Sequence, residues 1–405
     1  MEPLSVSYWA NRALNHARVI CGASPGRGSA TRAEAQAAEY VRGELDHLGV
    51  GEIRVQPFRG LRSLWFFLAL AFGIALMGHL AFWLLRPPLG DVLAWAISAA
   101  FFGFSFFLQW RKFTYQEFPL QETLPYGESQ NVIGVIPPEG ETRQRAVLVG
   151  HLDSHRAVIW YATDFLVTLY LLLSPIIVFG VLAAPVLYGL ALIADLAVFN
   201  WLGVVLGALH FVTWFSGVTA DLGAYSPGAN DNASAVGSLL SLVERLKEHP
   251  LEHTEVWVAF TGCEETGCGG MQVLLEKYGE ELRHARFIEL DMVGIGERLV
   301  YIQSEGVMRK RRVSDKLEAW VLKAGEAFDL QPLKGTGFGV ASEMGVVWEG
   351  GYQGVCLMAM RKDSALLPEW HRMSDVPDKL MVETLGRVHE LTWALLQVMD
   401  GETGY

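Results

Sequence analysis

Two adjacent glutamates, Glu264 and Glu265, follow an apolar, β-branched segment at residues 255–261 that is typical of a buried strand. Successive side chains at a strand end point to opposite faces, so Glu265 can bind a metal ion while Glu264 reaches the reacting water. Four more residues with metal-binding side chains lie near short apolar segments: His151, Asp231, Asp291 and His371. Two imidazoles and three carboxylates suit a site for two divalent cations, with one carboxylate bridging and a further glutamate acting as a base. Such a site activates water.

Each of these residues also has an ordinary structural explanation when it is taken alone. His151 can be a core histidine, Asp231 can cap a helix, and Asp291 can occupy a turn. The metal site is therefore predicted from the whole set, in its order along the chain. Five further histidines lack such neighbours and are interpreted as structural or exposed: His155, His210, His253, His284 and His389.

The composition indicates a membrane-spanning part. Of 405 residues, 51% are hydrophobic and only 19% are charged, which is too apolar for one ordinary soluble domain. Residues 64–85 and 92–110 are nearly uninterrupted apolar segments, each close to the ~20 residues that cross a bilayer. The turn between them contains Arg86-Pro87-Pro88, so the two segments predict a transmembrane hairpin.

A second apolar tract covers residues 157–217, and its only formally charged side chains are Asp164 and Asp195. Pro185 offers a break within the tract. The two spans are then expected near residues 162–183 and 186–215.

The positions of the metal-binding residues set the number of spans. His151 precedes the second tract and Asp231 follows it, and both must meet on one side of the membrane. An even number of spans is required, so we expect four transmembrane helices in all, with any third hydrophobic piece interfacial or re-entrant. Four buried core helices are the alternative, but the segments are long and lack polar faces. We expect an integral membrane protein, in the cell membrane if the chain is bacterial.

Basic residues predict the orientation in the membrane. Those that flank the spans on the side of the metal-binding residues are Arg59, Arg62, Arg111, Lys112 and Arg156, whereas the opposite turns hold only Arg86. Because positive residues favour the cytoplasmic side, the catalytic part is expected to face the cytoplasm. Residues 1–29 are polar and contain no apolar core of a signal peptide, so export is not expected.

The cysteines and the net charge exclude other kinds of site and partner. The four cysteines show no paired zinc-ligand spacing and are expected as free thiols in a reducing compartment. They are Cys21, Cys263, Cys268 and Cys356. The net charge of -12 and the lack of a basic stripe argue against nucleic acid as a partner.

Strands and helices alternate in the rest of the chain. Strands are expected near residues 53–58, 132–136, 146–150, 255–261, 287–290 and 355–360. Helices are expected over residues 31–48, 231–247, 270–278, 314–328 and 376–399, the first opened by a capping box at Thr31 and Glu34. This alternation predicts an α/β fold with a mostly parallel, mixed sheet flanked by helices, and with ligands at the carboxyl ends of strands.

The two apolar tracts interrupt one large domain. Without them roughly 300 residues remain, the size of a single α/β domain. The catalytic domain is expected to comprise residues 1–61, 113–156 and 218–405, with transmembrane hairpins at 62–112 and 157–217 inserted in its loops.

The motifs, in their order along the chain, resemble those of the di-zinc aminopeptidase and glutamate carboxypeptidase family, the family 28 metallopeptidases. They are His-x-Asp at 151–153, Gly-Ala-Asn-Asp-Asn-Ala-Ser at 228–234, Glu-Glu-x-Gly at 264–267, Leu-Asp-Met at 290–292 and His-x3-Asp-x2-Asp-Lys-Leu at 371–380. The similarity covers residues 120–300 without the second tract, and residues 355–395. It implies a zinc-exopeptidase-like fold.

The resemblance also implies a role for each matched residue. The implied zinc ligands are His151 and Asp291 for one ion, Glu265 and His371 for the other, and Asp231 as the bridge. Glu264 would be the general base, and Asp153 would orient the imidazole of His151 through its carboxylate. Two Zn²⁺ ions are the implied cofactors, and other divalent metals fit the same donor atoms.

This chain departs from the family pattern at two places. Many members have a tyrosine before the last histidine, where its hydroxyl holds the oxyanion, and this chain has Trp370, whose indole N–H could donate instead. The second apolar tract also lies inside a loop that is usually short. It starts six residues after His151 and ends fourteen before Asp231. We therefore expect the site at the bilayer surface, with membrane segments that serve it.

Three functions are compatible with these features. The first is a membrane-embedded di-zinc hydrolase of amide bonds, most simply an aminopeptidase acting on peptides, hydrophobic ones included. The second is an amidase that takes N-acyl amino acids or lipid amides from the bilayer, so that membrane lipid is a partner. The third is an inactive membrane scaffold or receptor-like subunit. All five ligands and the base are present, which favours an enzyme.

Overall fold

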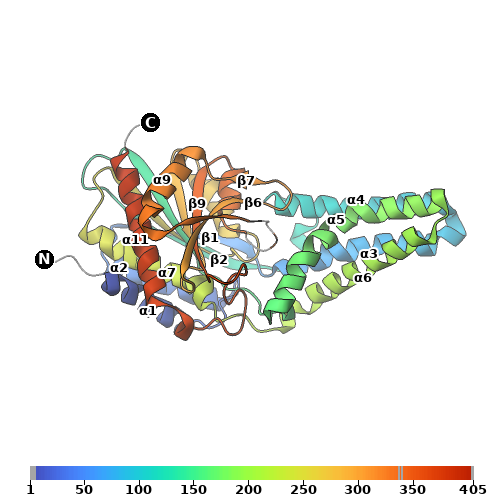
Figure 1. The fold of residues 1–405 in the computed structure, drawn as a ribbon, viewed down its shortest axis with the longest axis horizontal. Coiled ribbons are helices and arrows are strands. Elements are labelled where there is room, and N and C mark those ends of the chain that lie inside the picture. The colour runs from blue at the N-terminus through green and yellow to red at the C-terminus, as the bar shows by residue number, and fades with distance from the viewer. Residues whose placement is uncertain (1–5, 336–337, 339–340, 403–405) are drawn as a thin grey trace. The chain divides into compact units, whose positions relative to one another are not determined.

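The computed structural model describes residues 6–335, 338 and 341–402 and contains two compact units. The first, which we call the α/β unit, comprises residues 1–62, 126–164 and 224–405. The second, which we call the helical unit, comprises residues 63–125 and 165–223. Each unit is assembled from segments that are distant in the sequence (Figure 1).

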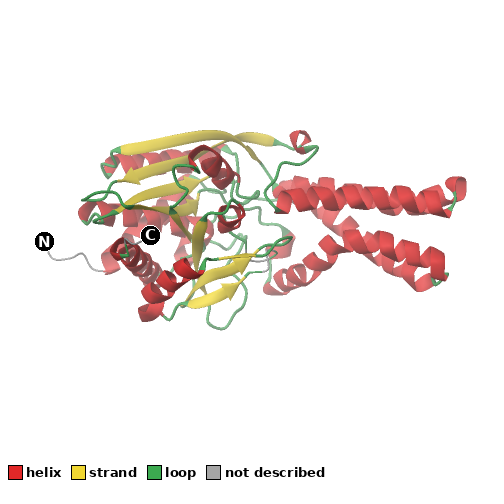
Figure 2. Cartoon of the chain, turned by 90° about the horizontal axis from the view of Figure 1, so that it is seen from above, coloured by secondary structure: helices red, strands yellow, loops and turns green. Residues whose placement is uncertain are grey.

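A nine-stranded mixed sheet forms the centre of the α/β unit, with helices on both of its faces (Figure 2). The strand order is β1-β2-β4-β3-β5-β9-β6-β7, and β8 pairs with β6. The strands are β1 (Glu52–Leu61), β2 (Tyr126–Ile136), β3 (Gln144–His151), β4 (Thr254–Thr261), β5 (Arg286–Leu290), β6 (Arg298–Glu305), β7 (Arg311–Arg312), β8 (Gln331–Lys334) and β9 (Gln353–Met360). The predicted α/β class with a mixed sheet is confirmed.

The parallel strands lie in the middle of the sheet. Strands β4, β3, β5 and β9 run parallel as neighbours, whereas the pairs β1–β2, β2–β4, β9–β6 and β6–β7 are antiparallel. Strand β8 pairs parallel with β6. In β3, Ala146, Val147, Leu148 and Val149 are all fully buried, as expected for a strand that helices cover on both faces. The carboxyl ends of the four parallel strands therefore share one edge of a buried sheet.

Seven helices surround the sheet among the described residues. They are α1 (Val6–Ala23), α2 (Arg32–His47), α7 (Ser234–Glu248), α8 (Gly269–Tyr278), α9 (Asp315–Gly325), α10 (Met344–Glu349) and α11 (Val382–Gly401). The predicted cap of α2 is present: the Thr31 side chain accepts a hydrogen bond from the amide of Glu34. The turns η2 (Ile159–Tyr161), η4 (Ala229–Ala233) and η6 (Pro377–Lys379) lie in the connecting loops.

Helix α1 was not expected, because residues 1–29 had been interpreted only as polar. Its buried face is made of Trp9, Ala13, Ala17 and Ile20, which recur at helical spacing but are mostly small. Helix α1 packs against α7 and α11. The contact with α7 is close, since a Cβ atom on Gly237 would clash with the carbonyl oxygen of Ala13.

His389 in α11 packs at the contact between α1 and α11. Its ring is fully buried and stacks on Trp9, with ring centroids 5.4 Å apart. Burial lowers the pKa of His389 to about 3, and the positive charge of Arg245 adds to this effect. The interpretation of His389 as a structural histidine agrees with this position.

Acid is expected to destabilise the α/β unit through His389. In the unfolded chain the imidazole takes up a proton below about pH 6.5, and in the folded chain it does so only near pH 3. The contribution of the buried, neutral imidazole of His389 to stability is therefore complete above pH 6.5, and it is lost as the pH falls towards 3. His389→Phe should shrink the stability loss between pH 6.5 and 4.5 by about 2 kcal/mol, measured by chemical unfolding. An unchanged pH dependence would contradict the assignment.

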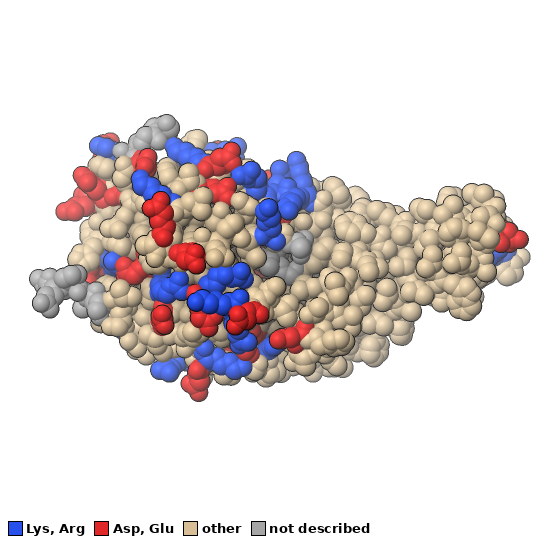
Figure 3. All heavy atoms as spheres, viewed as in Figure 1, with Lys and Arg blue, Asp and Glu red and all other residues tan. Residues whose placement is uncertain are grey.

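The helical unit consists of four long apolar helices. They are α3 (Leu64–Leu89), α4 (Asp91–Phe113), α5 (Asp164–Ala194) and α6 (Ala197–Thr219). All four are long and apolar enough to cross a membrane, as the sequence predicted. The face of this unit in Figure 3 is bare of charged side chains over most of its length.

The expected break at Pro185 is wrong. Pro185 lies inside α5, and the chain turns instead at Asp195, which has a φ of 51°. The carbonyl oxygen of Pro185 accepts a hydrogen bond from the indole of Trp95 at 2.8 Å. A proline is tolerated within an apolar helix when neighbouring helices satisfy the backbone groups near it.

A chain of hydrogen bonds links α3, α5 and α6 inside the helical unit. His79 Nδ1 lies 2.7 Å from the Tyr188 hydroxyl, and His79 Nε2 lies 3.0 Å from His210 Nδ1. His210 Nε2 lies 3.1 Å from the carbonyl oxygen of Ile177. Polar side chains that pair between apolar helices hold such bundles together, so His210 has the structural role that was expected.

Candidate metal centre

The predicted metal-binding residues lie at the carboxyl ends of neighbouring parallel strands. His151 is the last residue of β3, Asp291 follows β5 directly, and Glu264 and Glu265 follow β4 by a short turn. His371 lies in the loop after β9. This edge of an α/β sheet is where such folds place their ligands. The structure thus brings together residues that are up to 220 positions apart, from His151 to His371.

His151, Asp231 and Asp291 form the first group of possible metal ligands. His151 Nε2 lies 3.4 Å from Asp231 Oδ1 and 3.6 Å from Asp291 Oδ1. Two ligands of a tetrahedral zinc ion, each about 2.0–2.1 Å from the metal, are about 3.3–3.4 Å apart. All three side chains are buried, and their separations fit one ion.

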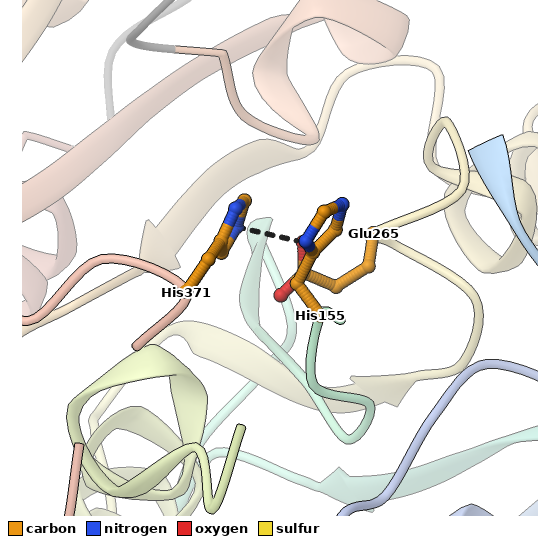
Figure 4. A group of neighbouring side chains, drawn as sticks. All are labelled: His155, Glu265 and His371. Carbon is orange, nitrogen blue, oxygen red and sulfur yellow. Dashed lines mark ion pairs between the residues drawn. The ribbon is translucent and has the colours of Figure 1, made fainter. Parts of the chain in front are cut away.

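A second group faces the other oxygen of Asp231. His371 Nε2 lies 3.4 Å from Asp231 Oδ2 and 3.0 Å from Glu265 Oε2. Figure 4 shows the pair formed by His371 and Glu265, with His155 beside it. Asp231 therefore presents one carboxylate oxygen to each group, the arrangement that a bridging ligand requires.

Hydrogen bonding in the protein does not satisfy this cluster. Glu265 Oε1 and Asp291 Oδ1 are buried and have no hydrogen-bond partner among the described residues. Burial and the neighbouring carboxylates raise the pKa values of Glu264 and Glu265 well above their usual range. Carboxylates crowded into a buried site favour a cation between them, because it removes their mutual repulsion. The donor set of imidazole and carboxylate fits zinc.

Asp231 is held in place because backbone amides of its loop donate hydrogen bonds to the carboxylate of Asp375. Its amide donates to Asp375 Oδ2 at 3.1 Å, and the amide of Asn230 donates to Asp375 Oδ1 at 2.7 Å. Asn232 pairs with both sides of Asp291: its side chain donates to the Leu290 carbonyl and accepts from the Met292 amide. The Asn-Asp-Asn sequence thus joins the loops that carry Asp231 and Asp291.

The carboxylate of Asp153 lies close both to His151 and to the backbone of the loop that carries the two glutamates. His151 Nδ1 lies 3.1 Å from the backbone oxygen of Asp153 and 3.5 Å from its carboxylate. That carboxylate accepts hydrogen bonds from the amides of Glu264 and Glu265, at 3.0 and 3.2 Å. Burial opposes its ionisation, but His151 and these donors hold the pKa of Asp153 below its usual range.

The N-terminal segment supplies three buried residues that sequence reasoning missed. Ser29 donates to Asp153 Oδ2 at 2.6 Å, and Glu34 accepts from the Cys263 amide at 2.9 Å. The guanidinium of Arg27 donates to the carbonyl oxygens of Leu152, Pro227 and Gly228. Only the capping box around Glu34 was visible in the sequence. These contacts tie the loops that carry the metal-binding residues to the start of α2.

Backbone strain marks the same loops. Cys263, Met292 and His371 have φ values of 54°, 50° and 55°, in the left-handed region that non-glycine residues rarely adopt. One of them precedes Glu264, one follows Asp291 and one is itself a candidate ligand. Strain that collects around one cluster indicates a functional site.

A segment between β3 and α5 lies against His371. We call residues 152–164 the strap. His155 stacks on His371 with ring centroids 3.8 Å apart, and Tyr161 meets His371 edge-on at 4.5 Å. Tyr161 also contacts the ring of Trp370 at 4.9 Å. The sequence predicts only a structural or exposed role for His155, although it stands four residues after His151.

Three buried glutamates lie near the candidate base and were not expected. The amide of Glu343 donates to Glu289 Oε1 at 3.0 Å, and the amide of Ser342 donates to Glu305 Oε1 at 3.2 Å. Thr261 donates to Glu343 Oε2 at 2.8 Å. Burial raises the pKa of Glu289 to about 7. No motif in the sequence distinguished these residues from surface glutamates.

Comparison with known sequences finds one family. The sequence model of the family described as Peptidase family M28 matches residues 204–396. This match confirms the resemblance to the family 28 metallopeptidases. A search of curated proteins finds no match to the chain.

Solved structures of bacterial zinc enzymes and cyclases share the fold. A leucine aminopeptidase precursor from Bacteroides thetaiotaomicron VPI-5482 is 16% identical with a TM-score of 0.55, and 96% of each chain is covered. A zinc aminopeptidase from Bacillus subtilis is 15% identical with a TM-score of 0.55, over 96% of this chain and 94% of that one. A glutaminyl cyclase from Bacteroides thetaiotaomicron is 16% identical with a TM-score of 0.55, over 96% of this chain and 97% of that one. These likenesses confirm the zinc-exopeptidase-like fold.

Proposed function

Given the M28 peptidase signature over residues 204–396 and the zinc-exopeptidase-like fold, we propose that this chain is a membrane-embedded di-zinc hydrolase of amide bonds, most simply an aminopeptidase. The observation that carries the proposal is the position of Asp231, whose two carboxylate oxygens each lie 3.4 Å from a different imidazole. Two zinc ions held there would lower the pKa of water towards neutrality and polarise the scissile carbonyl. Other divalent cations are the alternative occupants.

The chain's own residues then handle the proton. Glu264 Oε2 lies 4.0 Å from His151 Nε2, beside the ligands but not between them. It is suited to take the proton from water and return it to the leaving nitrogen. Asp153 fixes the glutamate backbone, and Asp375 fixes that of Asp231. Trp370 remains our candidate for a donor to the oxyanion, since its ring lies next to His371.

A hydrolysis screen tests the proposal. Purified protein in detergent, loaded with zinc, is given aminoacyl amides, di- and tripeptides, and N-acyl amino acids. We expect the release of amino acids from free N-termini. Hydrolysis of N-acyl amino acids alone would favour the lipid amidase, and no turnover of any substrate would favour the scaffold.

The likeness to glutaminyl cyclases adds a substrate to this screen. Structures of that kind share the fold at the same TM-score as the aminopeptidases. A peptide with an N-terminal glutamine separates the two reactions. Loss of ammonia with a new ring would identify a cyclase, whereas release of free glutamine would identify an aminopeptidase.

We further propose that the four apolar helices span a membrane with the α/β unit in the cytoplasm. The distribution of basic residues supports this orientation, because Arg86 is the only one near the turn between α3 and α4, whereas Arg111 and Lys112 lie at the other end of α4. Accessibility of a cysteine placed next to Gly90 to an impermeant reagent tests the orientation. Labelling from the cytoplasmic side would reverse it.

The helices α5 and α6 are expected to favour apolar substrates. The strap connects His151 to α5 in the chain, and this short connection supports a route by which apolar substrates come from the bilayer. Replacing residues 165–223 by a short polar loop should lower turnover of acyl-bearing or strongly apolar substrates roughly tenfold more than that of small soluble ones, equal to the loss of about two buried methylene groups. The measured quantity is the ratio of the two kcat/KM values. Equal losses, or none, would mean that the helices are only an anchor.

A further inference from the structure

His155 lies within reach of the second ligand group, although its place in the chain matches no implied ligand. One donor atom each of His155, Glu265 and His371 lie within 4.8 Å of one another. The three side chains face the same space in Figure 4, and His155 is 7% exposed. Zinc ligands are about 3.3–3.4 Å apart, and the rings of His155 and His371 are stacked with centroids 3.8 Å apart, so binding of one ion by all three residues requires the two rings to tilt apart.

The hydrogen bonding of His155 selects the form of the ring that binds metals. Its Nδ1 lies 2.8 Å from the carbonyl oxygen of Arg156. A carbonyl oxygen only accepts, so Nδ1 carries the proton and Nε2 keeps its lone pair. An Nδ1–H bond to a backbone carbonyl is a common way to orient a metal-binding imidazole.

The backbone on both sides of His155 is held by hydrogen bonds to residues 224–226. The His155 carbonyl accepts from the Ser226 amide at 2.9 Å, and the Ala157 amide donates to the Ala224 carbonyl at 3.0 Å. Ser154 donates to the Ser226 carbonyl through its hydroxyl at 3.0 Å. The backbone that carries the ring is thus fixed before any metal binds, which lowers the entropic cost of using His155 as a ligand.

We propose that His155 is an additional ligand of the metal ion bound by Glu265 and His371. The inference rests on the proposed metal centre and adds to its second site an imidazole that no family motif implies. A site with two imidazoles prefers zinc or cobalt to magnesium or manganese, because imidazole suits the later transition metals. The second site should therefore discriminate more strongly against magnesium and manganese than the first.

The competing role for His155 is to stack on His371 and hold its ring in place. His155→Phe separates the two roles, because phenylalanine keeps an aromatic ring and removes the donor nitrogen. We expect this variant to bind one ion as the wild type does. Its affinity for the second ion should fall at least about 100-fold, since the loss of an outer partner alone costs roughly 10–100-fold. Chelator competition followed by elemental analysis measures both affinities.

His389→Phe is the matched control. His389 is also buried and ring-stacked, on Trp9, but lies outside the metal centre. It should bind both ions normally. If His155→Phe also binds both ions with unchanged affinity, the stacking role is correct and the proposal is wrong.

A measurement on the unmutated chain covers the case in which His155→Phe does not fold. In the cobalt-loaded protein, the ring N–H of each cobalt-bound histidine gives a strongly shifted, exchangeable proton resonance. Three such resonances are expected, from His151, His155 and His371. Two would overturn the proposal.

These outcomes are independent of the hydrolase assignment. A chain that binds two ions but cleaves no substrate would refute the proposed reaction and leave the His155 measurements valid. A chain that hydrolyses peptides with two cobalt-bound histidines would refute only the role of His155.

Discussion

Glu264→Gln is expected to abolish turnover while both metal ions stay bound. Glutamine keeps the size of the side chain but cannot take up a proton, so the variant loses the base and no ligand. The loss of general base catalysis should lower kcat by at least about 10²-fold. The pKa of Glu264 is raised by burial and by its carboxylate neighbours, so bound cations are needed to keep it ionised. Steady-state kinetics and elemental analysis of the same sample measure the two quantities.

Glu265→Gln is the control for this result. It changes the adjacent residue in the same way, but Glu265 Oε2 lies 3.0 Å from His371 Nε2 within a group of possible ligands. This variant should lose one ion. If Glu264→Gln is the variant that loses zinc, the roles of the two glutamates must be exchanged.

Asp231→Asn is expected to lower the occupancy of both metal ions together. Each carboxylate oxygen of Asp231 lies 3.4 Å from a different imidazole, one from His151 and one from His371. An amide has a neutral oxygen and an NH₂ group in place of two charged oxygens, so it bridges two cations poorly. We expect both affinities to fall at least about 100-fold, more than the loss of an outer partner costs. Chelator titration resolves the two steps.

Asp291→Asn supplies the comparison. Asp291 belongs only to the group around His151, so its replacement should weaken one ion and spare the other. The backbone amides of residues 230 and 231 are held by Asp375 in both variants. Loss of a single ion from Asp231→Asn would show that this carboxylate does not bridge.

Local patterns predicted most of the elements. The capping box at Thr31 and Glu34 marks the start of α2, and β-branched apolar runs mark the strands. These signals act through neighbours in sequence, so they can be read without the fold. Helix α1 was not predicted, because its buried face is rich in alanine and depends on Gly237 of α7 for close packing. The helix break predicted at Pro185 was wrong, because neighbouring helices decide whether a proline ends an apolar helix.

The sequence by itself determined the candidate ligands and the candidate base of the site, because strand ends, an adjacent glutamate pair and ordered motifs are properties of the chain. It also determined that four segments are long and apolar enough for a membrane. Only the tertiary structure decided which atoms face each other: the two oxygens of Asp231, the amides held by Asp153, and the ring of His155 beside His371. Such contacts depend on side-chain direction and on the packing of loops from distant segments. Spacing along the chain carries no information about either.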